Sequence, residues 1–417
     1  MIQVRGHRAR DGKSDKEMID VFTRCRPHEA FEYGRRRGIV PHYRVVQERP
    51  AAGEVVIDGR TLIMAGSGDY LALAADPRVK EAACRAIGTW GLSTGGARAS
   101  SGSTVLHEEL EARLAAFLGR PAAMVLASGY LANLTLAALV GRDDLVFADA
   151  LIHASLVDAL LVSQARLRRY RHNEIEHLES LLARADQDRG AQDRGALIVT
   201  EGMFSPTGGL CDLPGIAKAA SRHGVRVVMD SAHDAGVMGA HGRGAAEHYG
   251  LESAVDVQTV PFSKSFGTIG GAVAGPEEVI VHLRHHARAM VFSAALPPAS
   301  AAATLAALDI ITDEPERRQR VLATATEIGD ELTGMGFRIL HSGTPIVAVH
   351  IGDTLPCYLF WNELFNQGVF TTAMIPPSVP EGQALIRLGL TAAHTDAQAE
   401  RILSAFATAG RVMHLIP

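Results

Sequence analysis

Lysine is scarce in this chain of 417 residues, and its scarcity singles out one position. Only five of the 41 basic residues are lysine, namely Lys13, Lys16, Lys80, Lys218 and Lys264. Lys264 is the only lysine from residue 219 onward, and it stands in the segment VPFSKSFGTIGG (260–271). Arginine keeps its charge, whereas a lysine amine can lose its proton and attack a carbonyl group. The position therefore suggests a role that arginine could not fill, although lysines in such loops are more often structural or solvated.

Other absences limit the class of protein. The four cysteines show neither CxxC spacing nor the density of a disulfide scaffold, so we expect free thiols in a reducing compartment. No stretch approaches the roughly 18 uninterrupted apolar residues of a membrane helix, and no apolar signal segment opens the chain. The net charge of −5 provides no basic field for nucleic acid. We therefore expect a cytoplasmic protein with no membrane span and no nucleic-acid partner.

Motifs for common cofactors and metals are also missing. The chain has no GxGxxG or P-loop pattern, which argues against a dinucleotide or ATP site. Three histidines in HLRHHARAM share a helical face at metal-ligand spacing, but no carboxylate stands near them. The segment DSAHD, with His241 beyond it, lacks a second acidic-histidine cluster to complete a metal site. We expect no metal.

Hydrophobic periodicity predicts an α/β core between about residues 105 and 275. Short apolar runs alternate there with amphipathic segments such as LHEELEARLAAFL and GIAKAASRHG, which indicates a mainly parallel sheet with helices on both faces. The predicted strands are AMVLA, LVFA, ALIVT, VRVVM and VDVQTV. The polar segment RADQDRGAQDRG (184–195) between a helix and a strand predicts an exposed loop.

The pattern changes beyond about residue 300. One long helix is predicted over 301–336, followed by strands in PIVAVHIGD, VFTTAMIPP and ALIRLGLTAAH, which suggests a smaller α+β unit. The first 50 residues are rich in interspersed charges and are interpreted as a solvated arm, with contact to an anionic partner or cofactor left open. The predicted division is an N-terminal segment 1–60, a large α/β domain 61–297 and a C-terminal α+β domain 298–417.

Polar residues follow the predicted strands, where α/β proteins bind their ligands. Asp230 ends an apolar strand, where a buried carboxylate is costly unless a cation pairs with it. A protonated pyridine nitrogen is one such cation. His233 is placed to hydrogen-bond a phenolic oxygen of the same ring, but taken alone it is better explained as a capping or turn residue.

Further candidates stand at neighbouring strand ends. Ser128, Gly129 and Tyr130 open a helix and would offer backbone N–H groups to a phosphate, or form a plain strand-to-helix turn. His153 is placed to stack on an aromatic ring or to act as an acid or base, and a surface histidine is the alternative. The remaining candidates are Glu201 and Ser205 as pocket lining, and Arg387 as a bidentate clamp for a substrate carboxylate.

These motifs, in this order, resemble the α-oxoamine synthase family of pyridoxal phosphate enzymes. The resemblance covers roughly residues 50–410. Its most specific pieces are ASSGSTVLHEELEARLAAFLG, ASGYLANL, IHASLVDA, VTEGMFSPTGGL, VVMDSAHDAGVMGAHGRG, FSKSFGTIGGAVAG, FSAALPP and RLGLTAAHT. The family implies fold type I, like aspartate aminotransferase. It has a large domain with a mainly parallel seven-stranded sheet and a smaller C-terminal α+β domain, in a homodimer with shared active sites.

The resemblance also implies roles for single residues. Lys264 would hold the cofactor covalently and act as the base, Asp230 would pair with the pyridine nitrogen and His233 with the phenolic oxygen. The other implied roles are ring stacking by His153, phosphate binding by Gly129 and Tyr130 with Ser263, contact to the partner subunit's phosphate by Ser293, and carboxylate binding by Arg387. Ser128, Glu201 and Ser205 stay cofactor-binding candidates because of their places at the strand ends.

The implied reaction is the decarboxylative condensation of an α-amino acid with an acyl thioester of coenzyme A or of a carrier protein. Its products are an α-aminoketone, carbon dioxide and free thiol. Two alternatives stay open: another fold type I activity, such as an aminotransferase or a retro-aldol lyase, and a degenerate subunit without catalysis.

Two positions depart from the family pattern. The family usually has threonine three residues before the lysine, where this chain has Pro261, with neither a hydroxyl nor an N–H group. A substrate-contacting asparagine of the family is replaced by Gly68 in SGDYLAL. The first change predicts weaker cofactor binding or a contact shifted to Thr259 or Thr268. The second predicts an altered amino-acid or acyl site.

Overall fold

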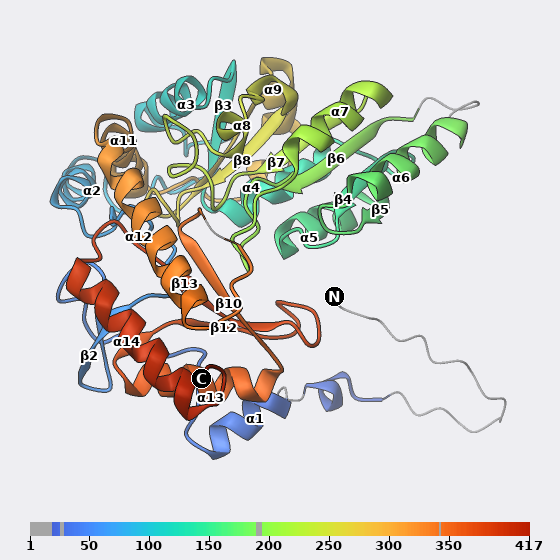
Figure 1. The fold of residues 1–417 in the computed structure, drawn as a ribbon. Helices are drawn as coiled ribbons and strands as arrows, with labels where there is room; N and C mark the ends of the chain where they lie inside the picture. The colour runs from blue at the N-terminus through green and yellow to red at the C-terminus, as the bar shows by residue number, and fades with distance from the viewer. Residues whose placement is uncertain (1–18, 26–28, 189–193, 342) are drawn as a thin grey trace.

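A computed structural model of the chain describes residues 19–25, 29–188, 194–341 and 343–417. In Figure 1 a large α/β part occupies one end of the molecule and a smaller α+β part the other. The chain crosses between the two parts more than once, because both its early strands and its last elements lie in the smaller part.

The large part is built on one seven-stranded sheet in the order β3-β9-β8-β7-β6-β4-β5. The strands β8, β7, β6, β4 and β5 run parallel, while β9 is antiparallel to both of its neighbours. This confirms the predicted fold class. The strands are β3 (Ala122–Leu126), β4 (Leu145–Asp149), β5 (Arg166–Tyr170), β6 (Ala196–Glu201), β7 (Arg226–Asp230), β8 (Val257–Pro261) and β9 (Gly271–Gly275).

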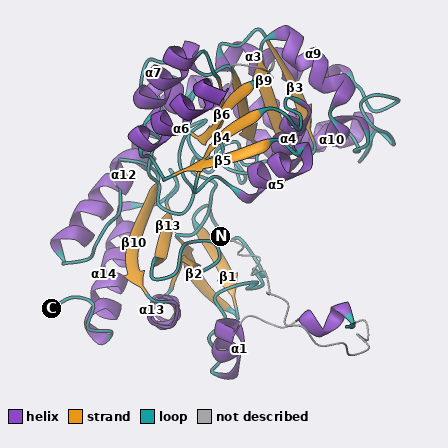
Figure 2. Ribbon diagram, turned by 90° about the vertical axis from the view of Figure 1, so that its right-hand side faces the viewer, coloured by secondary structure: helices purple, strands orange, loops and turns teal. Residues whose placement is uncertain are grey.

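Helices cover both faces of this sheet (Figure 2). Successive residues of β7 alternate between the two layers: Val227 and Met229 face one hydrophobic cluster, and Val228 faces the other. One face is covered by α3 (Val105–Leu118), α6 (Ile175–Asp188), α7 (Leu213–His223) and the short α8 (Ala245–His248). The other is covered by α4 (Gly129–Thr135), α5 (Ala154–Ser163), α9 (Glu277–His286) and α10 (Arg288–Val291).

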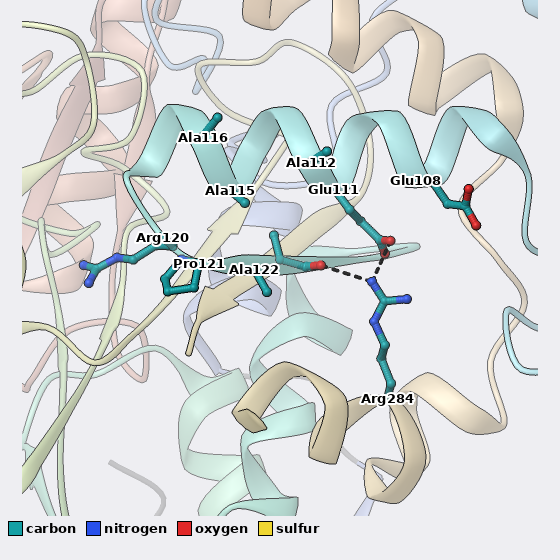
Figure 3. Close-up of a pocket in the computed structure, with 10 residues that line it drawn as sticks. Glu108, Glu111, Ala112, Ala115, Ala116, Arg120, Pro121, Ala122 and Arg284 are labelled. Atoms are coloured by element: carbon teal, nitrogen blue, oxygen red, sulfur yellow. Dashed lines mark hydrogen bonds and ion pairs between the residues drawn. The ribbon is translucent and has the colours of Figure 1, made fainter. Parts of the chain in front are cut away.

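Side chains cover the outer edge of β3, which is an edge strand of the sheet (Figure 3). The Val125 N–H donates to Glu111 Oε1 (2.9 Å), and Arg284 Nη2 donates to the Ala123 carbonyl (3.2 Å) and to Glu111 (2.7 Å). Arg98 adds two further bonds to the same carboxylate, at 2.9 and 3.2 Å. A groove of about 520 Å³ lies here between α3 and α9, and we interpret its charged lining as protection of a strand edge.

The smaller part contains two three-stranded sheets. One has the order β1-β2-β11 and the other β10-β13-β12. The pairing of β2 with β11 is parallel and joins Ile63 to Val369, so the two ends of the chain build this unit together. Its elements are β1 (Glu54–Ile57), β2 (Arg60–Met64), β10 (Ile346–Gly352), α13 (Thr354–Asn366), β11 (Val369–Phe370), β12 (Thr372–Met374), β13 (Ala384–Gly389) and α14 (Asp396–Val412).

Two segments differ from their predictions. The single long helix over 301–336 is wrong: the chain forms α11 (Pro298–Asp313) and α12 (Pro315–Gly334), because Pro315 lacks an N–H group and fits only at a helix start. The predicted loop 184–195 is helical as far as Asp188, and residues 189–193 lie outside the described residues.

The predicted N-terminal segment lies partly outside the described residues, since residues 1–18 and 26–28 are not described. Within it, α1 (Glu29–Arg36) lies beside α13, and a short 3₁₀ helix spans Val21–Arg24. The domain boundaries at residues 60 and 297 stay predictions. No helix in the described ranges is long and apolar enough to cross a bilayer.

Candidate active site

Strand register brings polar residues together at the carboxyl edge of the large sheet. Glu201 of β6 lies opposite Asp230 of β7, and Asp230 lies opposite Thr259 of β8. Lys264 follows β8 by three residues, in the turn that leads to β9. The charge of Lys264 lowers the pKa of Asp230, and the charge of Asp230 raises that of Lys264, so the two groups interact electrostatically.

Asp230 is a buried carboxylate with one free oxygen. Its side chain is 2% exposed, Oδ2 accepts a hydrogen bond from Asn133 Nδ2 (2.7 Å), and Oδ1 has no partner. Burial raises the pKa of Asp230, and the bond from Asn133 acts in the opposite direction. An unsatisfied buried carboxylate oxygen is costly, so this position fits a ligand that brings a cationic N–H group.

Lys264 is half-buried beside this carboxylate. Its Nζ lies 3.4 Å from Ser263 Oγ, to which it donates. Burial lowers the pKa of Lys264, and the charge of Asp230 acts against that change. Gly68 lies against the lysine stem, since a Cβ atom built there would stand 2.7 Å from Lys264 Cδ. Gly68, which stands where the family has asparagine, therefore leaves room for the side chain of Lys264.

His233 is held by a residue that the sequence analysis did not identify. Tyr70 Oη lies 2.6 Å from His233 Nδ1, and both side chains are buried. Burial, aided by the charges of Lys264 and Arg387, lowers the pKa of His233 well below its usual value. Burial also raises the pKa of Tyr70, so the phenol keeps its proton. We assign the phenol as donor to Nδ1, which leaves Nε2–H of His233 as a donor toward the site.

His153 caps α5 and is exposed on the open side of the site. Its backbone N–H donates to Glu201 Oε1, and its Nδ1 lies 2.7 Å from Ser155 Oγ. Burial and the nearby charge of Asp230 raise the pKa of Glu201 well above its usual value. Glu201 thus holds the backbone of His153, and burial and the charge of Asp230 make its own ionised form unfavourable.

The predicted phosphate-binding residues lie at the start of α4. Ser128 Oγ caps the helix by accepting from the Leu131 N–H (3.2 Å). Gly129 packs against Pro261, because a Cβ atom built on it would stand 2.5 Å from Pro261 Cβ. Tyr130 is 45% exposed, and its hydroxyl donates to Asp158 rather than into the site. This turn therefore offers backbone groups more readily than the tyrosine side chain.

Pro261 ends β8 where the ladder with β7 has already stopped at Thr259, so its missing N–H group costs no bond to that neighbouring strand. The two hydroxyls considered as substitutes for the family's threonine are engaged elsewhere. Thr259 Oγ1 donates to Asn133 Oδ1 (2.7 Å), and Thr268 Oγ1 lies 2.8 Å from Thr304 Oγ1. Neither replaces the missing hydroxyl in this arrangement.

Arg387 reaches the site from the smaller part of the molecule. It stands on β13, and its Nη1 donates to the Ser205 carbonyl (3.1 Å). Its Nε is buried without a hydrogen-bond partner, and its charge lowers the pKa values of Lys264 and His233. The guanidinium therefore borders the site with donors still free, as binding of a carboxylate requires.

Ser293 is placed differently from the other candidates. It follows α10, and its hydroxyl donates to the neighbouring Ala294 carbonyl (3.4 Å). This segment pairs with the 91–104 loop through a bridge between Ala97 and Ala294. A role for Ser293 within its own subunit's site gains no support from these contacts.

Three further residues border the site: Tyr70, Asn133 and Ser155. Each stands in a segment that also contains a predicted site residue; the segments are SGDYLAL, SGYLAN and IHAS. This closeness in sequence to a predicted residue is the only feature that could have identified them. The histidines on α9 form no metal site; His282 stacks on His286 at 4.3 Å. Across the described ranges, no group of three or more His, Cys, Asp or Glu side chains is arranged to hold a metal.

Comparisons with known proteins agree with this geometry. The family model "Aminotransferase class I and II" matches residues 60–406. An 8-amino-7-oxononanoate synthase of Symbiobacterium thermophilum is 39% identical over 90% of this chain and 95% of its own, and one of an Anaeromyxobacter species is 43% identical over 86% and 89%. The solved serine palmitoyltransferase of Sphingomonas wittichii superimposes with a TM-score of 0.90 at 31% identity, covering 96% of this chain and all of that one. The chain belongs to the aminotransferase class I and II family and, within it, to the α-oxoamine synthases, fold type I enzymes that use pyridoxal phosphate.

Proposed function

We propose that this site condenses an α-amino acid with an acyl thioester and releases carbon dioxide and a free thiol. The observation that carries the proposal is the free Oδ1 atom of Asp230, buried beside a lysine of lowered pKa. A carboxylate in that position holds a protonated pyridine nitrogen, and the lysine beside it supplies the amine that binds an aldehyde. The residues present therefore fit pyridoxal phosphate.

Each residue has a defined task in holding the cofactor. Lys264 Nζ would bind it covalently, Asp230 Oδ1 would accept from its ring nitrogen and His233 Nε2–H would donate to its phenolic oxygen. His153 would stack on the ring. The backbone of Gly129 and Tyr130 and the hydroxyls of Ser128 and Ser263 would hold the phosphate, without a threonine at position 261. When bound, the cofactor supplies the electron sink that stabilises negative charge at the substrate's α-carbon.

The remaining steps belong to the chain. Arg387 binds the amino-acid carboxylate through the donors that its contact with Ser205 leaves free. Lys264 Nζ would also take up the proton of the substrate's α-carbon, because burial favours the neutral amine. The same carboxylate leaves as carbon dioxide after the new carbon–carbon bond has formed.

The names of the relatives suggest a specific pair of substrates. In 8-amino-7-oxononanoate, the last two carbons and the amine are those of alanine without its carboxylate, and the remaining carbons form a seven-carbon acyl group with a terminal carboxylate. We propose this pair for the present chain. Serine with a long acyl chain is the second candidate, because solved structures of serine palmitoyltransferase superimpose on this chain with TM-scores of 0.90.

A substrate matrix tests the choice. Purified protein is given alanine or serine with a seven-carbon dicarboxylic or a sixteen-carbon acyl thioester, and free thiol and carbon dioxide are measured. Alanine with the shorter acyl group should give the highest kcat/KM. Transfer of the amino group without carbon dioxide release would instead identify an aminotransferase.

Substitution of the lysine tests the mechanism itself. Lys264→Ala should abolish the visible absorbance of the bound cofactor and lower the rate by at least about 10⁴-fold, since it removes both attachment and base. Borohydride should fix the cofactor onto Lys264 in the parent protein. Lys80→Ala, on the exposed face of α2 (Pro77–Trp90), is the matched control and should retain full activity. An active Lys264→Ala protein would sink the proposal.

The protein is also proposed to act as a cytoplasmic homodimer that shares its sites. Large apolar side chains stand exposed on segments near the site and on the loop that pairs with residue 294, including Leu92 (76%), Phe292 (78%) and Ile269 (54%). Exposed apolar groups of this size commonly mark an interface. Light scattering on the purified chain tests the dimer, and cell fractionation tests the location.

A further inference from the structure

A chain of hydrogen bonds joins two site residues that stand on different elements. Thr259 Oγ1 donates to Asn133 Oδ1 (2.7 Å). The amide nitrogen of Asn133 then donates to Asp230 Oδ2 (2.7 Å) and to Ser155 Oγ (2.9 Å). Ser155 Oγ in turn lies 2.7 Å from His153 Nδ1. The network of hydrogen bonds runs from the buried Thr259 and Asp230 to the exposed His153.

The direction of the last bonds follows from the backbone. The Ser155 N–H lies 3.2 Å from His153 Nδ1, and a backbone N–H can only donate. His153 Nδ1 is therefore an acceptor without a hydrogen, and the Ser155 hydroxyl donates to it as well. Nε2 carries the ring hydrogen in this tautomer, so the donor of His153 lies on the side of the ring away from α5.

Burial makes the network hard to rearrange. Asn133 and Asp230 are each 2% exposed, Ser155 is 1% exposed and Thr259 is fully buried. If the amide of Asn133 were turned over, its oxygen would face the Asp230 carboxylate and its nitrogen the Thr259 hydroxyl. A repulsive contact would then replace an attractive one in a region without water access. The amide orientation is therefore fixed from both sides.

We propose that Asn133 and Ser155 are positioning residues that tie the carboxylate of Asp230 to the tautomer and ring position of His153. The inference rests on the proposed function, in which Asp230 and His153 both contact the cofactor. Asn133 occupies one carboxylate oxygen and so leaves the other for the ring nitrogen. Ser155 fixes the ring of His153 over the same site. We expect Asn133 to affect cofactor binding and Ser155 to affect turnover, so the two effects can be measured separately.

The Ser155 end should affect turnover more than cofactor binding. Ser155→Ala removes the hydroxyl donor to His153 but leaves the bond between Asn133 and Asp230. We expect kcat to fall about tenfold, with KM and the cofactor Kd each within about threefold of the parent. Ser155→Thr keeps a hydroxyl and should recover most of the loss. Ser163→Ala, at the other end of α5, is the matched control and should change neither quantity.

The Asn133 end should affect cofactor binding. Asn133→Leu removes the donor to Asp230 and should raise the cofactor Kd about tenfold or more, measured by absorbance titration of cofactor-free protein. Thr259→Val keeps the shape of a buried strand residue while removing the hydroxyl that orients the amide. It should raise the Kd about threefold, and Thr259→Ser should restore it.

The outcomes separate this inference from the proposed function. A parent protein that binds no pyridoxal phosphate contradicts the proposed function before any variant is compared. The proposed positioning role is wrong, and the proposed function stands, if the parent binds the cofactor but Ser155→Ala has the kcat of the parent. The same holds if Thr259→Val has the cofactor Kd of the parent. A Ser155→Thr protein as slow as Ser155→Ala also overturns it, because the effect would then not follow the hydroxyl.

Discussion

Burial acts in opposite directions on the ionisable residues of the site. It raises the pKa values of Asp230 and Glu201, and it lowers those of Lys264 and His233. The acids are thereby pushed toward their protonated forms and the bases toward their neutral forms. A cationic ring nitrogen would restore the charge of Asp230, so binding of the cofactor and ionisation of the carboxylate reinforce each other.

Tyr70 offers a test of one such contact. Tyr70→Phe removes the donor to His233 Nδ1 and leaves a buried ring nitrogen unsatisfied, so we expect kcat to fall about tenfold. The chain should remain folded, because the apolar part of the side chain is kept. In a His233→Asn background the same change should have little further effect, as a double-mutant cycle of kcat/KM would show. Additive losses in that cycle would contradict the contact.

Sequence reasoning proposed most of the candidate residues that the structure brings together, but not the residues that form hydrogen bonds to them. Lys264 and Asp230 were identifiable because lysine is rare here and a carboxylate is unusual at the end of an apolar strand. Tyr70 and Asn133 carry no charge and stand far from their partners in the chain, by 163 and 97 residues respectively. Only the folded structure brings them together. The engaged hydroxyl of Thr259 likewise depends on strand register, which composition does not specify.

Among the secondary-structure elements, the two edges of the large sheet are protected in different ways. Arg166, Arg168 and Arg169 stand exposed on the edge strand β5, where their charges oppose pairing with another sheet. On β3 the protection is specific, because Glu111 and Arg284 occupy backbone groups of the strand itself. β5 was absent from the predicted strands for the same reason: a charged edge strand lacks the apolar run that reveals buried ones.

The β3 edge gives a prediction about stability. Arg284→Ala frees the Ala123 carbonyl and removes one of the two arginines paired with Glu111. The free energy of unfolding should fall by about 1–3 kcal/mol, and heated protein should associate faster by light scattering. Arg222→Ala, which breaks an exposed pair with Glu179, should cost less than about 1 kcal/mol. Equal effects of the two variants would argue against edge protection.

A histidine ties β2 to the segment before α14. His394 is 2% exposed; its Nε2 donates to the Met64 carbonyl (3.2 Å) and its Nδ1 accepts from the Thr391 N–H (3.2 Å). Burial lowers the pKa of His394 to about 4, whereas the unfolded chain protonates it near 6.5. Between these values the unfolded state binds the additional proton. Acid should therefore destabilise the fold as pH falls from about 6.5 to about 4.

Replacement of this histidine isolates the effect. His394→Gln keeps a hydrogen-bond donor but cannot be protonated. Its unfolding free energy should therefore change less between pH 7 and pH 4 than that of the parent. The two changes should differ by up to about 3 kcal/mol. Denaturant titrations at several pH values provide the measurement. His248→Gln, at an exposed position, should follow the parent curve. A parent and His394→Gln with parallel pH profiles would exclude the assigned protonation state.

At the scale of the whole molecule, the site depends on parts far apart in the chain and, as proposed, on a second subunit. Gly68 touches Lys264, and Arg387 approaches from the smaller part to bond Ser205. Ser293 forms only local bonds, as expected if its function lies in the partner's site. The order of elements could be predicted from sequence, but the junction of the two parts could not, since no local pattern encodes it.

Hybrid dimers test whether each active site contains residues of both subunits. Lys264→Ala and Ser293→Asp each disable a site, the second by placing negative charge beside a phosphate. If each site combines Lys264 of one subunit with Ser293 of the other, remixing the two inactive proteins should recover about a quarter of parent activity, because half of the dimers then contain one intact site. A mixture of Lys264→Ala with Asp230→Asn should recover none. Recovery in neither mixture would place Ser293 within its own subunit's site.

The parallel pairing of β2 with β11 has a consequence for synthesis of the protein in the cell. Ile63 cannot pair with Val369 until that residue has been synthesised. The site around Gly68 and Lys264 likewise stays incomplete until Arg387 has been synthesised and bonds to Ser205. A growing chain on the ribosome can form the large sheet well before its last residues emerge, but it cannot complete the substrate-binding side. Retention of the amino acid, rather than of the cofactor, should therefore report on finished chains. Truncation within β13 should leave a folded core that cannot retain an amino acid.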